Sequence, residues 1–286
     1  MMAELIDRKR LKAEMRELLS TAQVSPRGMA ALYLGLAMVL GVLDYLSGGG
    51  NAVLDRNLVG IFVYVLTTLL TAVLGAGFSL YCMAVRRGER AEYLTLFDGF
   101  SFVGKLIALT IVETVFIMLW SMLFVVPGIV AAYRYRFALY NLYENPGIGV
   151  MEALDMSKRQ TWGYKSQLFA LDWSYFGWLM LASLPMLVML FLLYRLIFQI
   201  VTGPVPDLPA AELVAQAIIL PMWAWSLISS AFSLVVGLFF VPNRECVELG
   251  YFEIAKRTSG VGLRDGGPPR LEDDPNSGWT GGWGQM

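Results

Sequence analysis

Two stretches of this chain, residues 57–85 and 213–242, are long, strongly apolar and free of charged side chains. A helix needs about 20 apolar residues to cross the roughly 30 Å hydrocarbon core of a bilayer. Within lipid, a single apolar segment satisfies its own backbone hydrogen bonds by forming a helix. Both stretches exceed that length. With 57% hydrophobic and 16% charged residues, and a mean hydropathy of +0.58, the sequence predicts an all-α, polytopic transmembrane helical bundle.

Four more stretches bring the expected number of membrane helices to about six. Three of them hold a single acidic residue each and are expected to span: 29–46 with Asp44, 106–127 with Glu113 and 168–194 with Asp172. The remaining stretch, 128–143, is short and contains Arg134 and Arg136. Its assignment depends on the distribution of charge in the loops.

Lysine and arginine near helix ends concentrate on the cytoplasmic side of a membrane. Eighteen of the 22 basic residues lie in four segments, with six in 1–27, four in 86–105, three in 145–167 and five in 243–286. These segments share one side only if 128–143 returns across the bilayer after a turn at Pro127 and Gly128. The sequence therefore predicts a multi-pass protein of the cytoplasmic (inner) membrane with both termini cytoplasmic.

The remaining segments complete the expected organisation. Residues 1–27 form a cytoplasmic amphipathic helix, 28–257 the six-span domain and 258–286 a disordered tail rich in Gly, Pro and acid, with Trp279 and Trp283 near its end. A second amphipathic helix is expected at about 146–160, with Ile148, Met151 and Leu154 toward the bilayer. Both helices either lie on lipid at the cytoplasmic side or form a docking surface for a partner.

Ionisable groups at membrane depth are costly, so they are expected to face a partner, a cavity or water. The candidate intramembrane polar cluster consists of Glu113, Arg134, Arg136, Tyr140 and Tyr143. A turn at Pro127 and Gly128 would place the helices that carry these residues side by side. The cluster either lines a cavity or locks helices together.

Familiar enzyme chemistry has little support in this composition. The chain has no histidine and only two cysteines, Cys82 and Cys246, which lie far apart and form no CxxC pair. We expect no catalytic residue, no metal site and no cofactor. Nucleic acid is not an expected partner, because the basic residues are interspersed with acids and membrane orientation accounts for them.

The segment from Pro127 to Trp178 resembles a family of bacterial integral membrane proteins catalogued as domain of unknown function family 975. The resemblance rests on two blocks, VPGIVAAYRYRFALYNLYENPGIGVMEAL and SKRQTWGYKSQLFALDWSYFGW. The family-like positions are Pro127, Gly128, Tyr135, Tyr140, Asn145, Pro146, Glu152, Ala153, Ser157, Lys158, Gly163, Lys165, Phe169, Phe176, Gly177 and Trp178. The block near the end, FVPNRECVELGYFE, is similar only loosely, since Asn243 stands where the family has an aromatic residue. The resemblance implies a multi-helix membrane protein and assigns no reaction or catalytic residue.

The lipid bilayer is the first expected partner of this chain. Two classes of function remain open. The first is a non-enzymatic scaffold, assembly factor or regulator of an envelope process, with a membrane or cytoplasmic protein as its partner. The alternative is a small transporter or exporter component with a polar intramembrane site and a small-molecule substrate. An intramembrane enzyme has the least support, because no catalytic pair is recognisable.

Overall fold

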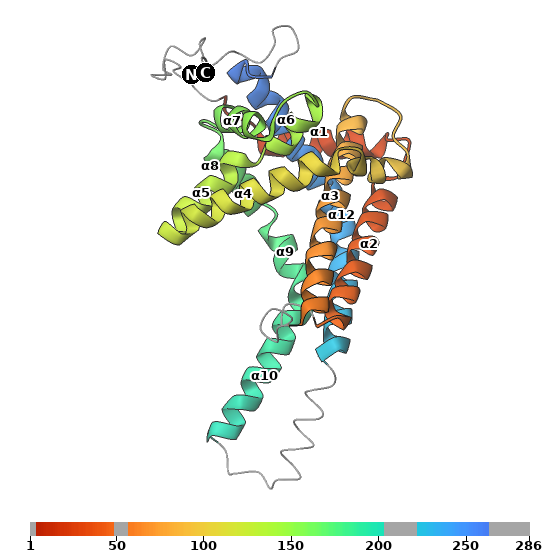
Figure 1. The fold of residues 1–286 in the computed structure, drawn as a ribbon. Helices are drawn as coiled ribbons and strands as arrows, with labels where there is room; N and C mark the ends of the chain where they lie inside the picture. Colours follow the sequence, from red (N-terminus) through yellow and green to blue (C-terminus); the bar gives the residue numbers. More distant parts are fainter. Residues whose placement is uncertain (1–3, 49–56, 203–221, 263–286) are drawn as a thin grey trace. The chain divides into compact units, whose positions relative to one another are not determined.

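The computed structural model describes residues 4–48, 57–202 and 222–262, and every regular element in these residues is helical (Figure 1). In chain order the helices are α1 (Arg8–Ser20), α2 (Pro26–Leu46), α3 (Leu58–Arg86), the 3₁₀ helix η2 (Tyr93–Phe102), α4 (Val103–Leu123), α5 (Val125–Tyr135), α6 (Ala138–Glu144), α7 (Val150–Gln160), α8 (Lys165–Trp173), α9 (Phe176–Ala182), α10 (Leu184–Thr202) and α12 (Met222–Ser259). The predicted all-α class is confirmed for this part of the chain.

Four helical stretches among the described residues are long and apolar enough to cross a membrane: Pro26–Leu46, Leu58–Arg86, Tyr93–Leu123 and Ala224–Ser259. A fifth arises if the pair Phe176–Ala182 and Leu184–Arg195, bent by 59°, is one broken span. The predicted count of about six spans is not confirmed.

Two of the predicted spans account for the difference, the bent stretch 168–194 and the short stretch 128–143. The chain breaks at Phe124, whose φ and ψ of −161° and 154° are extended, and α5 then begins before Pro127. A proline in the first helical turn needs no N–H donor, so Pro127 is accommodated there rather than forming the predicted turn. A second break follows Tyr135, and α5 is 11 residues long, about 16 Å, which is too short to cross a bilayer alone.

Helix α12 continues well past its predicted end at Pro242. It is 38 residues long and carries Pro242 in its interior. An interior proline costs about 3 kcal/mol, but Val247, Leu249 and Phe252 beyond it are almost completely buried. Their burial supports the helix through a segment that a search for apolar spans treats as a polar tail.

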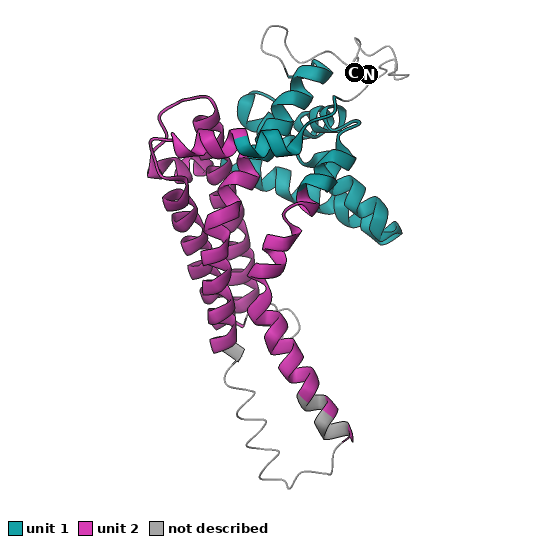
Figure 2. Cartoon of the chain, turned by 180° about the vertical axis from the view of Figure 1, so that it is seen from behind, with its two compact units in different colours: residues 1–13, 102–171, 247–286 teal, residues 14–101, 172–246 magenta. Residues whose placement is uncertain are grey.

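The helices fall into two compact units (Figure 2). Unit 1 comprises residues 1–13, 102–171 and 247–286, and unit 2 comprises 14–101 and 172–246.

Unit 2 contains a bundle of α2, α3 and the first part of α12, which lie side by side in both views. The C-terminal half of α3 is buried almost continuously from Val73 to Met83. The Phe78 ring stacks on Tyr33 of α2 with centroids 5.2 Å apart. Cys82 and Cys246 are both free thiols and both fully buried.

Unit 1 is built on a hairpin of α4 and α5, with α6 and α7 packed against its base. Gly128 of α5 lies so close to Ser121 of α4 that an added Cβ would come within 2.0 Å of the serine Oγ. The hairpin tip is apolar and uncovered, with Met122 75% and Val125 72% exposed.

The core of unit 1 changes the interpretation of the second amphipathic helix. Ile148 and Leu154 are buried with Leu109, Ala138 and Leu142 rather than turned to lipid, so the prediction for their side chains is wrong. Met151 does face outward and is 56% exposed. The apolar face of α7 is thus covered by protein, and its other face is exposed in the part of the chain that the structure describes.

Two predictions fall on parts of the chain outside the described residues. These are the start of the expected sixth span, 213–221, and the tail 263–286 with Trp279 and Trp283.

Candidate functional site

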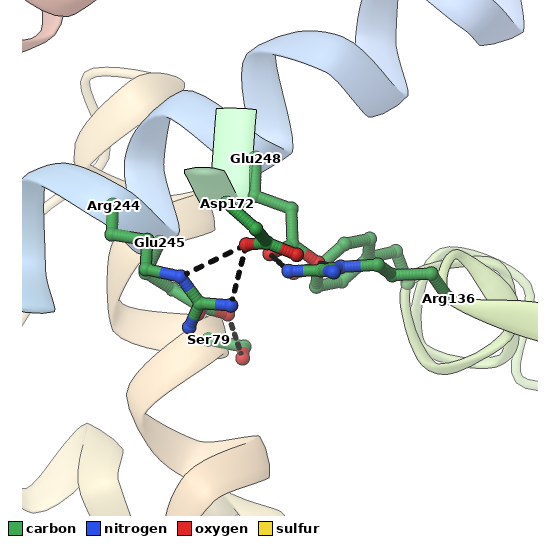
Figure 3. A network of polar contacts seen from close by, with 7 residues as sticks. Ser79, Arg136, Asp172, Arg244, Glu245 and Glu248 are labelled. Atoms are coloured by element: carbon green, nitrogen blue, oxygen red, sulfur yellow. Dashed lines mark hydrogen bonds and ion pairs between the residues drawn. The ribbon is translucent and has the colours of Figure 1, made fainter. Parts of the chain in front are cut away.

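The central polar contact of unit 1 joins Arg136 to Glu248 (Figure 3). Arg136 lies in the break between α5 and α6, where the chain turns its side chain toward α12. Its Nε and Nη2 donate to Glu248 Oε1 and Oε2 at 2.7 and 2.6 Å, which is the two-pronged geometry that guanidinium and carboxylate groups favour. The Tyr140 hydroxyl donates to Glu248 Oε1 at 3.3 Å.

This contact is surrounded by aromatic rings and shielded from solvent. The Glu248 and Arg136 side chains are only 7% and 18% exposed. Phe252 packs against Phe137 and Tyr140, with ring centroids 5.5 and 5.3 Å apart. An isolated charge would be strongly disfavoured here, so each ion depends on the other.

Two further pairs extend the polar core of unit 1. The side-chain amides of Asn141 and Gln160 hydrogen-bond to each other in both directions, at 2.7 and 2.8 Å, and the Gln160 amide also donates to the Val261 carbonyl. Lys256 Nζ pairs with Glu144 Oε2 at 2.6 Å. The Asn141–Gln160 pair joins residues 19 positions apart, and the other two contacts join residues 101 and 112 positions apart. Together they hold α6 against α7 and the end of α12.

The break between α5 and α6 is stabilised by a side chain of α7. Ser157 Oγ donates to the Arg134 carbonyl at 2.9 Å and accepts from the Phe137 amide at 3.0 Å. It therefore satisfies backbone groups that lose their helical partners on both sides of Arg136. The fully buried Ser157 is one of the family-like positions.

The structure brings part of the predicted intramembrane cluster together. Arg136 and Tyr140 meet at Glu248, whereas Tyr143 packs against Phe102 and the Arg134 guanidinium lies over the Tyr135 ring at 5.9 Å. Glu113, on α4, is partly buried and has no ion pair among the described residues.

Several family-like positions have clear structural roles. Gly163 has a φ of +84°, which favours glycine, and the Pro146 carbonyl accepts a hydrogen bond from Lys105. The Asn145 amide donates to the Asn141 carbonyl. In unit 2, Trp178 stacks on Phe240, whereas a Cβ added at the neighbouring Gly177 would meet open space.

Two basic family-like residues, Lys158 and Lys165, lie at the surface of unit 1. Burial lowers the pKa of the Lys165 ammonium below its usual value, and the positive charges of Arg134 and Lys158 lower it further. The Lys165 ammonium also lies 5.7 Å from the centre of the Trp162 ring.

Unit 2 has polar contacts of its own, also drawn in Figure 3. Ser79 of α3 donates to Glu245 of α12 at 2.5 Å. Asp172, the acidic residue of the predicted span 168–194, accepts from Arg244 at 2.9 Å in a more exposed pair.

Sequence reasoning missed the acceptor at the centre of the site. Glu248 lies 112 positions after Arg136 and beyond the predicted end of the last span, so neither spacing nor hydropathy pointed to it. The only available signal was helical periodicity. Cys246, Leu249 and Phe252 recur at three-residue spacing, as on one face of a helix, and this pattern would extend the last helix through Glu248.

These groups are not arranged as a metal centre. Among the described residues no three or more Cys, Asp or Glu side chains are grouped so that they could hold a metal ion. Two cavities of about 570 and 510 Å³ lie in unit 2 and are lined by other residues.

The fold and its contacts define a helical protein with apolar helices of membrane length and a small polar core in unit 1. Residues 122–205 match the model of a family described as "Protein of unknown function (DUF975)", which confirms the resemblance seen in the sequence. The matched segment runs from the hairpin tip through α5 to the end of α10. No curated protein and no solved structure matches the chain.

Proposed function

We propose that this is a non-enzymatic protein of the cytoplasmic membrane that acts as a scaffold, assembly factor or regulator of an envelope process. The observation that carries the proposal is the mutual pairing of the polar groups in unit 1. Arg136 binds Glu248, Asn141 binds Gln160 and Lys256 binds Glu144. Groups paired in this way fix the positions of helices and are not poised to transfer protons or to hold a substrate.

The outer face of α7 is the surface that we assign to a protein partner. Met151 on α7 and Trp162, in the turn just after α7 ends, are 56% and 72% exposed, and the exposed charged residues Asp155 and Lys158 lie between them in the sequence. An exposed aromatic and a methionine beside charged residues are typical of protein interfaces, where tryptophan often contributes much of the binding energy. The buried face of α7 holds this surface rigid.

The test is purification of the full-length protein from native membranes in mild detergent, with quantitative mass spectrometry of what remains bound. We expect a protein in reproducible stoichiometry with the wild type and at least tenfold less of it with Lys158→Glu combined with Trp162→Ala. Arg257→Glu, a charge reversal at another exposed position of unit 1, is the control and should retain the partner. A partner retained equally by both variants would refute the assignment of α7.

Transport is the second candidate, and Glu113 favours it. This carboxyl group lies in the candidate span Tyr93–Leu123 without an ion-pair partner among the described residues, as a group that binds a substrate or proton would. A small molecule that co-purifies with the wild type and is lost with a well-folded Glu113→Gln variant would establish transport over the scaffold.

A further inference from the structure

The larger cavity lies in unit 2 and is amphiphilic. Its volume is about 570 Å³, within the range of ligand pockets. It is formed where the end of α1, the start of α2, the start of α9 and the middle of α12 meet. Its polar side includes Arg16, Arg27 and Asn243, and its apolar side includes Trp178, Phe239 and Phe240.

Contacts within unit 2 fix the walls of this cavity. The Tyr175 hydroxyl donates to Asn243 Oδ1 at 2.7 Å, and the Trp178 ring stacks on Phe240 with centroids 6.0 Å apart. The Arg27 guanidinium lies 5.5 Å from the centre of the Phe239 ring. The apolar wall and one of the two arginines are thereby held in place without a ligand.

The charge of the cavity is uncompensated. Arg16 and Arg27 are both exposed and form no ion pair with any described residue. None of the described side chains that line the cavity is acidic. Two cationic groups beside an apolar wall are complementary to a ligand that has an anionic head and a hydrocarbon body.

Lining residues such as Arg27 and Trp178 lie near the ends of apolar helices, and this favours a lipid over a soluble anion as the ligand. Arg27 lies in the first turn of the candidate span Pro26–Leu46, so it is placed where a membrane helix enters the bilayer. Tryptophan side chains such as Trp178 favour the same depth, and basic pockets between membrane helices bind the head groups of acidic lipids.

We propose that this cavity binds one anionic phospholipid, with its phosphate between Arg16 and Arg27 and its glycerol and first acyl carbons against Trp178 and Phe239. Neither these residues nor the lipid takes part in the scaffold proposal, which rests on unit 1. The site therefore stands or falls separately from it.

The experiment titrates full-length protein in neutral detergent with short-chain phosphatidylglycerol and counts bound lipid by native mass spectrometry. Phosphatidylcholine of the same chain length is the zwitterionic comparison. We expect one phosphatidylglycerol to bind at least tenfold more tightly than phosphatidylcholine. Arg16→Gln combined with Arg27→Gln should weaken it roughly 25-fold, or about fivefold for each arginine, in line with about 1 kcal/mol per basic residue near an anionic lipid surface.

A matched double variant, Arg10→Gln with Arg257→Gln, removes the same charge at exposed positions outside the cavity and should bind within twofold of wild type. Trp178→Ala tests the apolar wall and should weaken phosphatidylglycerol at least threefold with both arginines present. If the double arginine variant fails to fold, the single variants Arg16→Gln and Arg27→Gln replace it. Equal binding of the two lipids, equal loss in the control, or displacement of lipid by inorganic phosphate at the same concentration would overturn the proposal.

Discussion

Among the described glycines of unit 2, Gly77 of α3 is the one at which helix packing leaves the least room for a Cβ. A Cβ there would come within 1.8 Å of the Leu96 carbonyl oxygen and 2.6 Å of its carbon, and backbone atoms cannot move aside as a flexible side chain can. We expect Gly77→Ala to lower the free energy of unfolding by about 1–3 kcal/mol through overpacking.

Gly35 of α2 is the matched control, because a Cβ added there meets nothing within 4 Å. Gly35→Ala should leave stability unchanged or raise it by up to about 1 kcal/mol, the gain from a better helix former. Unfolding of both variants in detergent, followed by intrinsic fluorescence, measures the difference. Equal stability of the two variants would show that α3 and η2 are not packed this closely.

Lys165 gives unit 1 a defined dependence on pH. Its pKa is lowered in the folded protein, first by burial and then by Arg134 and Lys158. Between that lowered pKa and the usual value of about 10.4, the unfolded chain binds more protons at this position than the folded protein does. The contribution of Lys165 to stability therefore rises with pH across this window, and the unfavourable effect of the charged form is fully present below it.

Replacing Lys165 by glutamine should remove this contribution. We expect the melting temperature of Lys165→Gln to rise less, or fall more, than that of wild type between pH 8 and pH 10.5. Lys9→Gln, at an exposed position of α1, should follow the wild-type profile. Parallel profiles for wild type and Lys165→Gln would mean that the ammonium is solvated.

At the scale of elements, the second half of α12 is held in unit 1 by the pair Arg136–Glu248. Arg136→Met would leave the 7%-exposed carboxylate without its counter-charge and should destabilise the protein by about 3–5 kcal/mol. Glu248→Leu should cost a similar amount, and the double variant should cost much less than the sum of the two, because no isolated ion then remains buried.

The pair Asp172–Arg244 is the natural comparison, because its side chains are 24% and 34% exposed. Removing either partner there should cost about 1 kcal/mol or less. A double-mutant cycle for each pair, measured by unfolding in detergent, provides the coupling energies. Additive effects of the substitutions at Arg136 and Glu248 would show that this ion pair does not hold the second half of α12 in unit 1.

The elements themselves were predictable to different degrees. Pro26–Leu46 and Leu58–Arg86 follow directly from hydropathy and match the expected stretches closely. The extent of α12 could not be predicted from hydropathy. Its last turns are stabilised by burial and by ion pairs with partners about a hundred positions away, and a local sequence pattern does not show such partners. The predicted turn at Pro127 is instead the first turn of α5, because proline is suited both to a turn and to a first helical turn. In the candidate site, Arg136 and Tyr140 were found from their depth in an apolar segment, whereas Glu248 was not.

At the scale of the whole molecule, the packing of α4 against α5 bears on which side of the membrane the chain lies after α5. The distribution of loop charges predicts that Lys105 and Lys158 share one side of the membrane. A six-span count achieves this by letting 128–143 cross alone, but α5 is only 11 residues long. Because α4 and α5 pack against each other as a hairpin within unit 1, we expect the chain to return toward the side from which α4 began.

The hairpin therefore leaves the expected orientation of the termini unchanged while altering the prediction for its tip. A reporter of cytoplasmic location fused after Asn145, and a second fused after Ser259, should both be active inside the cell. A cysteine at Val125, which is 72% exposed, should carry an environment-sensitive fluorophore with the blue-shifted emission of an apolar surrounding, whereas the same label at Arg257 should emit as in water. The buried native cysteines add little background. An external location of the fusion at Asn145 would mean that α5 does not return with α4, and the assignment of 145–167 to the cytoplasm would then be wrong.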